Sequence, residues 1–293
     1  MEKKDVVVIG GSAAGRTAAL TSRRHYPNKD VVLIDKEKDV LVPCPIPYIF
    51  GTLGKPEMDI FPNAALEKEG VEIVNSSITS VDPGKKIVSN GNGGKFEYDK
   101  LVLATGSLPI KPPIPGIEKK NIFYVEKNID YIRKMLDAMN EAKNMVIVGC
   151  GFIGVELAEE CSKNRDINIT IVEMMHHCLM LTYDEEFALN AEDTLKQKGI
   201  KILGEERVVE FAGGDKVEKV KLSSGKELEA DIVLMGIGAS ANTGPAESAG
   251  LEIGPQKSGQ GNRYMHTSDP ESFVCGDCAE KVSFFDGKRS RLK

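Results

Sequence analysis

The sequence predicts an α/β fold with two parallel β-sheets, each built around one strand–turn–helix unit. A short apolar strand, a glycine-rich turn and a helical segment follow one another at residues 6–24 and again at residues 145–163. A second apolar strand follows each helix, at residues 31–34 and 169–172. Continuous Val/Ile strands are typical of parallel sheets that are buried on both faces. The alternation of strands and helices is typical of doubly wound sheets.

The composition is that of a soluble globular protein, with 41 % hydrophobic and 28 % charged residues in a chain of 293. This length favours two domains. The net charge of −6 offers no electrostatic footprint for nucleic acid or an anionic membrane. The chain starts almost directly with an apolar strand, and no signal peptide or membrane-length apolar run is found. We therefore expect a cytoplasmic protein with no nucleic-acid or membrane partner.

The elements between the two units follow from local signals. Residues 43–47 carry three prolines and should open a short helix. Glycines at 91–94 predict a hairpin turn between strands at 87–88 and 96–98, and residues 98–104 predict a buried strand. Four prolines at 109–115 predict a stiff extended linker and a domain boundary. Helical spacing marks residues 126–142, and residues 200–235 resemble a small β-meander.

The second glycine turn, Gly149-Cys-Gly-Phe-Ile-Gly154, has the full context of a dinucleotide site. Gly149 permits the tight turn, Gly151 lets the backbone approach a pyrophosphate, and Gly154 allows close packing of helix on strand. Glu173 ends the next strand, 19 residues after Gly154, where a carboxylate binds ribose hydroxyls. The same carboxylate repels a 2′-phosphate, so NADH is favoured over NADPH, although the nearby pair His176-His177 could soften this preference.

The first turn is Gly10-x-Ser12-x-x-Gly15, with Asp35 at the end of the second strand. Serine at the middle position departs from the strict glycine pattern but is small enough for close approach of a phosphate. Two distant segments strengthen this prediction. One is a strand that ends in a tight turn at 101–106, and the other is a short strand that ends in Gly276-Asp277.

These segments together resemble the FAD-dependent pyridine nucleotide–disulfide oxidoreductases, and within them the single-cysteine branch of coenzyme A disulfide reductases, persulfide reductases and NADH oxidases. The matching segments occur in the family's order and span nearly the whole chain. They are the turn at 10–15 with Ala18-Ala19, the run Cys44-Pro-Ile-Pro-Tyr48, the turn at 104–106, the turn and helix at 149–156, and the run Gly276-Asp-Cys-Ala-Glu280.

The resemblance implies two Rossmann-like domains of the glutathione-reductase type, one for FAD and one for NADH. The FAD domain would be discontinuous, with residues 1–115 and 241–293 enclosing an NADH domain at 116–240. Asp277 would bind the ribityl chain, Asp35 the adenosine ribose, and the backbone of Ile78 the adenine. The further cofactor-binding positions expected from the resemblance are Ala13, Lys36, Pro43, Ala104, Thr105, Gly106, Ile153, Gly238 and Gly276.

Two positions at the second turn match family residues near the stacked rings. Phe152 falls where members place an aromatic side chain that covers the nicotinamide pocket, although ordinary core packing is an alternative. Glu156 falls where members place a carboxylate near the flavin and nicotinamide, and we expect a catalytic role for it; a charge on the helix surface is the alternative.

Cys44 is the predicted redox residue. The family's disulfide-type members use a C-x-x-x-x-C pair, which this chain lacks, whereas Cys44 with Pro47 and Tyr48 matches the pattern of the single-cysteine members. Amides at the start of the following short helix, with Pro45 suited to its first position, would stabilise a thiolate. Such a thiolate can form a mixed disulfide or persulfide for reduction. A buried structural thiol is the alternative.

The remaining cysteines are expected to be thiols without a function, because a reducing compartment disfavours disulfides. Cys275 and Cys278 have metal-ligand spacing, but no second pair accompanies them. The run His176-His177-Cys178 lacks a partner cluster, and Cys150 lies inside the phosphate turn. We therefore predict no metal site.

The resulting prediction is an enzyme that transfers hydride from NADH to FAD and then electrons to a disulfide, persulfide or polysulfide through Cys44. Oxidase members carry a histidine in the first turn, where this chain has Ala13 and Ala14, which favours sulfur over oxygen. The alternatives are an NADH oxidase, a reductase of a small electron carrier, and a truncated module without turnover. Full-length members are homodimers, and the chain ends before their C-terminal dimerisation domain, so we expect a truncated chain that could be monomeric.

Overall fold

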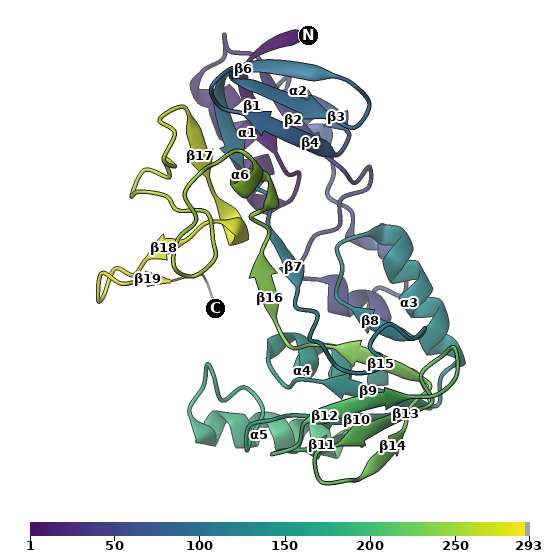
Figure 1. The fold of residues 1–293 in the computed structure, drawn as a ribbon. Helices are drawn as coiled ribbons and strands as arrows, with labels where there is room; N and C mark the ends of the chain where they lie inside the picture. The colour runs from purple at the N-terminus through teal and green to yellow at the C-terminus, as the bar shows by residue number, and fades with distance from the viewer. Residues whose placement is uncertain (291–293) are drawn as a thin grey trace. The chain divides into compact units, whose positions relative to one another are not determined.

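The computed structural model describes residues 1–290, and they form two compact units (Figure 1). The first unit comprises Met1–Val42, Phe61–Leu108 and the described residues 240–290. The second comprises Pro43–Ile60 and Pro109–Ala239. The predicted α/β class with parallel sheets is confirmed.

The first unit is built on a mixed sheet with strand order β3-β2-β1-β6-β5-β4, to which β17 adds on β6. Strands β1, β2, β3, β6 and β17 pair in parallel. Strands β5 and β6 pair antiparallel as the predicted hairpin, and β4 adds antiparallel to β5. The strands are β1 (Glu2–Ile9), β2 (Val31–Asp35), β3 (Glu72–Asn75), β4 (Ile78–Asp82), β5 (Ile87–Asn90), β6 (Lys95–Leu103) and β17 (Ser272–Val274).

Apolar strands form the core of this unit because both faces of its central strands are covered. Val7 and Val32 belong to one buried cluster, and the alternate residues Val8 and Leu33 belong to another. The helices of the unit are α1 (Ala13–His25), α2 (Ala64–Lys68), α6 (Gly244–Ser248) and the short 3₁₀ helix η3 (Gly276–Cys278). A hairpin of β18 (Lys281–Val282) and β19 (Arg289–Ser290) follows.

The second unit has a five-stranded parallel sheet with order β11-β10-β9-β15-β8. Its strands are β8 (Ile122–Tyr124), β9 (Asn144–Val148), β10 (Asn168–Val172), β11 (Lys201–Leu203) and β15 (Ile232–Met235). Its helices are α3 (Ile129–Glu141), α4 (Phe152–Ser162) and α5 (Glu185–Gln197), with the 3₁₀ helices η1 (Ile46–Phe50) and η2 (Pro56–Asp59) in the segment 43–60.

The predicted meander is shorter than the sequence pattern indicated. Only β12 (Val208–Ala212), β13 (Lys219–Leu222) and β14 (Glu227–Glu229) form the antiparallel sheet. The apolar runs on either side of them, β11 and β15, belong to the parallel sheet instead, because each pairs with a neighbour that is distant in the sequence. Strands β7 (Ser107–Pro109) and β16 (Ala239–Ala241) pair as a separate two-stranded sheet.

The segment 43–60, which carries Cys44, belongs to the second unit, although the sequence assigned it to the first domain. Its η1 packs on α4, and Glu160 of α4 accepts hydrogen bonds from the backbone N–H of Thr52 at 2.9 Å and from its hydroxyl at 2.8 Å. Arg133 of α3 pairs with Glu57 of η2, so both 3₁₀ helices contact helices of this unit.

Candidate functional site

The turn between β9 and α4 has the backbone geometry that a dinucleotide turn requires. Gly149 has φ +97°, a conformation that favours glycine. A side chain at Gly154 would overlap the carbonyl oxygen of Gly149, so glycine there lets helix and strand lie close together. A Cβ at Gly151 would meet nothing within 4 Å, so this side of the turn is open to a ligand.

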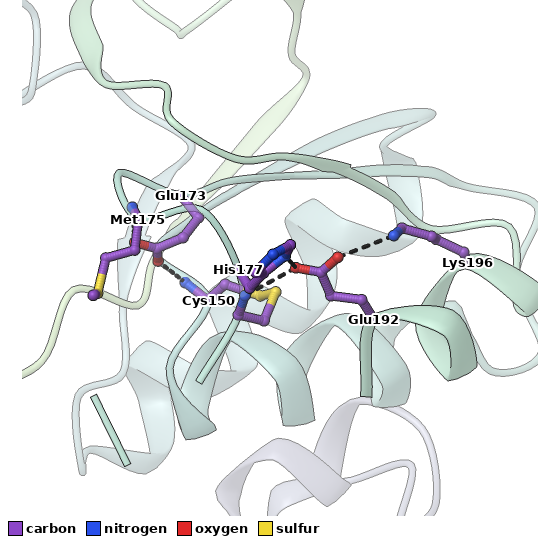
Figure 2. Close-up of a disulfide and its surroundings, with 7 residues drawn as sticks. Cys150, Glu173, Met175, His177, Glu192 and Lys196 are labelled. Atoms are coloured by element: carbon purple, nitrogen blue, oxygen red, sulfur yellow. Dashed lines mark hydrogen bonds and ion pairs between the residues drawn. A yellow bond between two sulfur atoms is a disulfide. The ribbon is translucent and has the colours of Figure 1, made fainter. Parts of the chain in front are cut away.

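Glu173 follows β10 and holds this turn in place. One carboxylate oxygen accepts the backbone N–H of Cys150 at 2.7 Å, and the other accepts the N–H of Met175 at 2.8 Å (Figure 2). The acidic residue therefore connects the turn with the loop that follows its own strand, at the carboxyl ends of parallel strands where α/β sheets bind ligands.

The first turn repeats this arrangement in the other unit. Gly10 has φ +110°, and Asp35, after β2, accepts the backbone N–H of Gly11 with one oxygen and that of Glu37 at 2.7 Å with the other. A side chain at Gly15 would overlap the carbonyl oxygen of Gly10. Two turns with the same hydrogen-bond pattern thus occur in two separate compact units.

Arg16 is a contributor to the first turn that sequence reasoning missed. It is only 8 % exposed, and its guanidinium donates to the carbonyl oxygen of Gly11 at 2.7 Å and to the side chain of Asn63 at 2.6 Å. It also lies over the ring of Phe61, 5.0 Å from its centroid. Burial lowers the pKa of Arg16, and the nearby Asp35 opposes that change. A single arginine on an amphipathic helix carries no sequence signal that would distinguish it from a surface residue.

Gly276 and Asp277 lie next to the first turn of α1. Gly276 has φ +76°, and a Cβ there would lie 2.8 Å from the Cβ of Ala14. Asp277 accepts a hydrogen bond from the hydroxyl of Ser107 at 3.0 Å. The residues Ala13, Ala14, Thr17, Ala18, Thr21 and Cys275 line a shallow open groove along α1.

The turn after β6 is tied to the chain that returns to this unit. The Thr105 hydroxyl donates to the carbonyl oxygen of Asn242 at 2.6 Å, and Gly106, at φ +70°, accepts the backbone N–H of Asn242 at 2.9 Å. Ala104 is buried, and its N–H donates to Ile9 at the end of β1. The turn therefore lies at the same end of the sheet as the first glycine turn.

The other predicted cofactor positions in the first unit have ordinary local roles. Ser12 precedes α1 as its N-cap residue but makes no side-chain capping bond. Ile78 opens β4 and packs on the apolar core, and Lys36 pairs with Glu37 at 3.5 Å.

The ring of Phe152 is 47 % exposed and contacts Tyr183 edge-to-face, with centroids 5.8 Å apart. Core packing of Phe152 is therefore not observed. Its neighbour Ile153 is half-buried, and Glu156 lies one turn further along α4. Burial raises the pKa of Glu156, and the charges of Glu159 and Glu160 on the same helix add to this rise. Such a carboxyl holds a proton to a higher pH than an exposed one.

A hollow of about 410 Å³ lies beside Glu173 in the second unit. The loop after β10 provides several of its walls, and Arg207 contributes a positive charge that the sequence gave no reason to associate with Glu173. The hollow is lined by Met174, Met175, His176, Met180, Glu205, Arg207, Val209 and Ser223. In the same unit, Gly238 follows β15 with φ +99°, and its carbonyl oxygen accepts the backbone N–H of Ile110 at 3.1 Å.

Cys44 is a free, exposed thiol that directly precedes Pro45, the N-cap residue of η1. The expected short helix is present as a 3₁₀ helix, but Pro45 is its N-cap residue rather than its first helical residue. The reason is the tight i→i+3 bond from Tyr48 N–H to the carbonyl oxygen of Pro45, at 2.9 Å. Pro43, the first residue of this segment in the second unit, is half-buried.

The other cysteines differ from Cys44. Cys161 and Cys278 are buried and Cys275 is half-buried; burial raises the pKa of Cys161 to about 12 and that of Cys275 to about 11. Cys150 and Cys178 form a disulfide, which corrects the expectation that both are thiols. They are 28 residues apart in the sequence, and only the fold brings their Cα atoms to 4.7 Å.

The run His176-His177-Cys178 lies against carboxylate side chains. His176 faces Glu205 at 3.1 Å, and Nδ1 of His177 faces the buried carboxylate of Glu192 at 3.3 Å. Within residues 1–290, His, Cys, Asp and Glu side chains form no group of three or more that could hold a metal ion. No helix in the same part of the chain is long and apolar enough to cross a membrane.

Comparison with known proteins shows which family the chain matches. Residues 4–290 match the pyridine nucleotide-disulphide oxidoreductase family. The chain is 32 % identical over 296 residues to an NADH oxidase of Methanocaldococcus jannaschii. It is also 32 % identical over 294 residues to an NAD(P)H coenzyme A polysulfide/persulfide reductase of Pyrococcus horikoshii. The matches cover 97 % and 98 % of this chain, but it spans only 65 % of the length of either relative.

The fold is similar to that of an NAD-dependent persulfide reductase from A. fulgidus, with a TM-score of 0.92 and 32 % identity. That match covers 98 % of this chain and 56 % of the solved one. The two glycine turns, their acidic partners and these similarities lead to one conclusion: the chain belongs to the pyridine nucleotide-disulphide oxidoreductase family.

Proposed function

We propose that this chain is the nucleotide-binding part of a cytoplasmic flavoenzyme that uses NADH to reduce a disulfide, persulfide or polysulfide through Cys44. The proposal that the electron acceptor is a sulfur compound rests on the exposure of Cys44. Among the described residues, Cys44 is the free cysteine that is exposed. The names of the Pyrococcus horikoshii and A. fulgidus relatives, a polysulfide/persulfide reductase and a persulfide reductase, support the same acceptor class.

The residues of the first unit fit FAD. Glycines at 10, 11 and 15 let the turn pack closely on Ala104 and Asp35, and the first amides of α1 have no side-chain cap. Helix N-termini of this kind bind pyrophosphate groups. Asp35 and Asp277 offer carboxylate oxygens for ribose and ribityl hydroxyls. FAD bound there would supply the hydride-accepting chemistry that no amino-acid side chain supplies.

The residues of the second unit fit NADH. The open side of Gly151 admits a pyrophosphate to the backbone, and Glu173 offers a carboxylate to the ribose hydroxyls. We assign the hollow beside Glu173 to the adenosine end of the dinucleotide. Glu173 disfavours the 2′-phosphate of NADPH, whereas Arg207 in the same hollow attracts it, so the preference for NADH should be moderate. The relatives named for NAD(P)H are consistent with a moderate preference.

The role of Cys44 is nucleophilic. Its thiolate attacks one sulfur of R–S–S–R, forms a mixed disulfide and releases RS⁻. Two electrons that originate from NADH then cleave the mixed disulfide, which restores the Cys44 thiolate and releases the second RS⁻. The balance is NADH, one proton and R–S–S–R giving NAD⁺ and two R–SH. Burial raises the pKa of the half-buried Glu156, so it holds its proton to a higher pH than an exposed carboxyl, and we propose it as the carboxyl group that moves a proton during the cycle.

The deciding experiment compares Cys44→Ser with a control variant, Cys161→Ala, in a buried position on α4. NADH consumption is measured without oxygen, with coenzyme A disulfide or polysulfide as acceptor, and separately in air. We expect Cys44→Ser to lose at least about a hundredfold of the sulfur-dependent rate while NADH still bleaches the flavin. Cys161→Ala should keep both. Sulfur-dependent turnover that survives Cys44→Ser would contradict the proposal.

Oxygen is the second candidate acceptor, favoured by the name of the Methanocaldococcus jannaschii relative. Reduction of oxygen does not require a cysteine thiolate that attacks a substrate sulfur. If the rate in air exceeds the sulfur-dependent rate in the wild-type chain, the oxidase function replaces the sulfur reductase function.

A further inference from the structure

The disulfide Cys150–Cys178 lies in the second dinucleotide turn, and nothing in the family comparison assigns it a role. Cys150 stands between Gly149 and Gly151, and its N–H is the one that Glu173 accepts. Cys178 belongs to the loop 174–184 between β10 and α5. Figure 2 shows Glu173 and Cys150 joined on one side and His177, Glu192 and Lys196 on the other, with the disulfide between them.

The loop is attached to the turn and to α5 close to the disulfide. The N–H of Leu179 donates to the carbonyl oxygen of Cys150 at 2.8 Å. The N–H of Cys178 donates at 3.0 Å to Glu192, which is 4 % exposed and also receives Lys196 at 2.9 Å. Burial by itself raises the pKa of Glu192, but the bonds from Lys196 and Cys178 outweigh it and the net shift is downward.

The backbone at the cross-link is strained. Leu179 has φ +62°, in the left-handed region that a branched side chain rarely adopts. Such a conformation persists where the surroundings impose it. At Leu179 the surroundings include the adjacent disulfide, the bond from its N–H to Cys150, and the bonds that its carbonyl oxygen accepts from the N–H groups of Thr182 and Tyr183.

Both sulfurs are inaccessible, which argues against a role in turnover. Cys150 is 1 % exposed and Cys178 is 0 % exposed. Attack on a disulfide requires access of a thiolate to one sulfur, so exchange with a bulky substrate would be slow. The pair therefore acts on the geometry of the turn rather than as a second redox centre.

We propose that the Cys150–Cys178 disulfide positions the NADH site: it holds the loop 174–184 against the phosphate turn and so keeps the turn, Glu173 and the loop in the arrangement that binds the dinucleotide. This inference rests on the proposed binding of NADH to the second unit. Reduction by a small dithiol adds two electrons and two protons, gives two cysteine thiols and oxidises the dithiol to its own disulfide. The reduced chain then binds NADH more weakly.

The first measurement is the mass of the intact protein, alkylated under denaturing conditions with and without prior reduction. The expected result is four alkylated cysteines without reduction and six after it, because the chain has six cysteines and two are paired. Six alkylated cysteines without reduction, in protein purified without thiols, would overturn the proposal.

The second measurement is the dissociation constant for NADH, determined by titration of the flavin-loaded chain under conditions too brief for turnover. We expect at least a threefold weaker affinity in wild type treated with dithiothreitol until its intact mass shows six cysteines open to alkylation, and the same weaker affinity in Cys150→Ser/Cys178→Ser with or without the reductant. Cys161→Ala, which changes another cysteine of the same unit, should respond to dithiothreitol as the wild type does. Equal affinity in the oxidised and reduced wild type would overturn the inference.

Hydrogen exchange of residues 174–184 separates this inference from the proposed function. If NADH binds neither form, the proposed function fails, and the inference fails with it. If NADH binds both forms equally, only the inference fails. If the inference is right, reduction weakens NADH binding and also speeds hydrogen exchange at Cys178 and Leu179. The amides of β1 and β2 should keep their exchange rates, and the flavin content should stay the same.

Discussion

At the scale of single residues, Gly151 and Gly154 in the second dinucleotide turn have different tasks. Gly154 is required by the protein's own packing, because a Cβ there would overlap the carbonyl oxygen of Gly149. Gly151 faces open space and has an ordinary φ of −77°, so nothing within the protein requires glycine there. The missing side chain at Gly151 therefore matters only to a ligand that binds against the turn.

We therefore predict opposite effects of alanine at these two positions. Gly151→Ala should leave stability nearly unchanged but weaken NADH binding about tenfold, about 1.4 kcal/mol. Gly154→Ala should lower the free energy of unfolding by about 3 kcal/mol or more, because the backbone must shift to make room for the added Cβ. Denaturant melts and NADH titrations check both. A Gly151→Ala variant that binds NADH as tightly as the wild type would refute the assignment of this turn.

Asp59 is a residue whose charge state should affect stability. It is 3 % exposed, and one carboxylate oxygen has no hydrogen-bond partner. Burial raises its pKa from 3.8 to about 6. Because the folded-state pKa is above the ordinary value, the folded chain loses stability as the pH rises from about 4 through 6, and the penalty is complete above pH 6.

Asp59→Asn should thus raise the free energy of unfolding at pH 7.5 by up to about 3 kcal/mol. The gain should shrink as the pH falls through 6 and vanish near pH 4. Asp82→Asn is a useful comparison, because the backbone N–H of Lys85 lowers the pKa of Asp82, and this variant should show no gain at pH 7.5. An equal gain from Asp59→Asn at both pH values would contradict this account.

At the scale of elements, α4 has two separate functions. Its first turn forms part of the dinucleotide turn, and Glu160 near its end holds the segment 43–60. The side chain of Glu160 is 5 % exposed and pairs with Lys163 at 2.6 Å as well as with Thr52. One helix therefore connects the turn of the second unit with the segment that carries Cys44.

Glu160→Ala should destabilise this connection by about 1–2 kcal/mol, because it removes the hydrogen bonds that the buried carboxylate accepts from Thr52 and Lys163. Hydrogen exchange should speed up at residues 48–53. Glu160→Gln, which keeps an oxygen for Thr52, should lose less. Glu159→Ala removes an exposed ion pair with Lys198 and should change stability by less than about 0.5 kcal/mol. Equal losses in the Glu159 and Glu160 variants would refute the role of Glu160.

At the scale of the whole molecule, the two nucleotide turns belong to compact units with separate apolar cores. The structure thus predicts that each turn can be damaged without loss of the other. Gly10→Ala, where a Cβ would overlap the carbonyl oxygen of Ala104, should abolish retention of flavin but leave NADH binding within about twofold.

The measurement is flavin absorbance per chain together with the NADH dissociation constant of the flavin-free protein. Gly151→Ala is the reciprocal control and should retain a full complement of flavin. If Gly10→Ala loses NADH binding as well, the two units do not bind their nucleotides independently.

The sequence by itself determined the α/β class, both strand–turn–helix units and the position of each acidic partner, because these depend on local periodicity and on spacing within about thirty residues. It also singled out Cys44 through its proline and tyrosine neighbours. Its cofactor and catalytic assignments remain predictions that the binding and activity measurements above can test.

Only the tertiary structure decided which distant residues meet. It paired Cys150 with Cys178, buried Arg16 under the first turn, grouped residues 43–60 with the second unit, and moved β11 and β15 from the meander into the parallel sheet. None of these follows from local pattern, since parallel pairing and side-chain contacts across a sheet join segments whose separation in the sequence carries no signal. The physical reason is that local preferences select the elements, whereas burial of their shared apolar faces selects their partners.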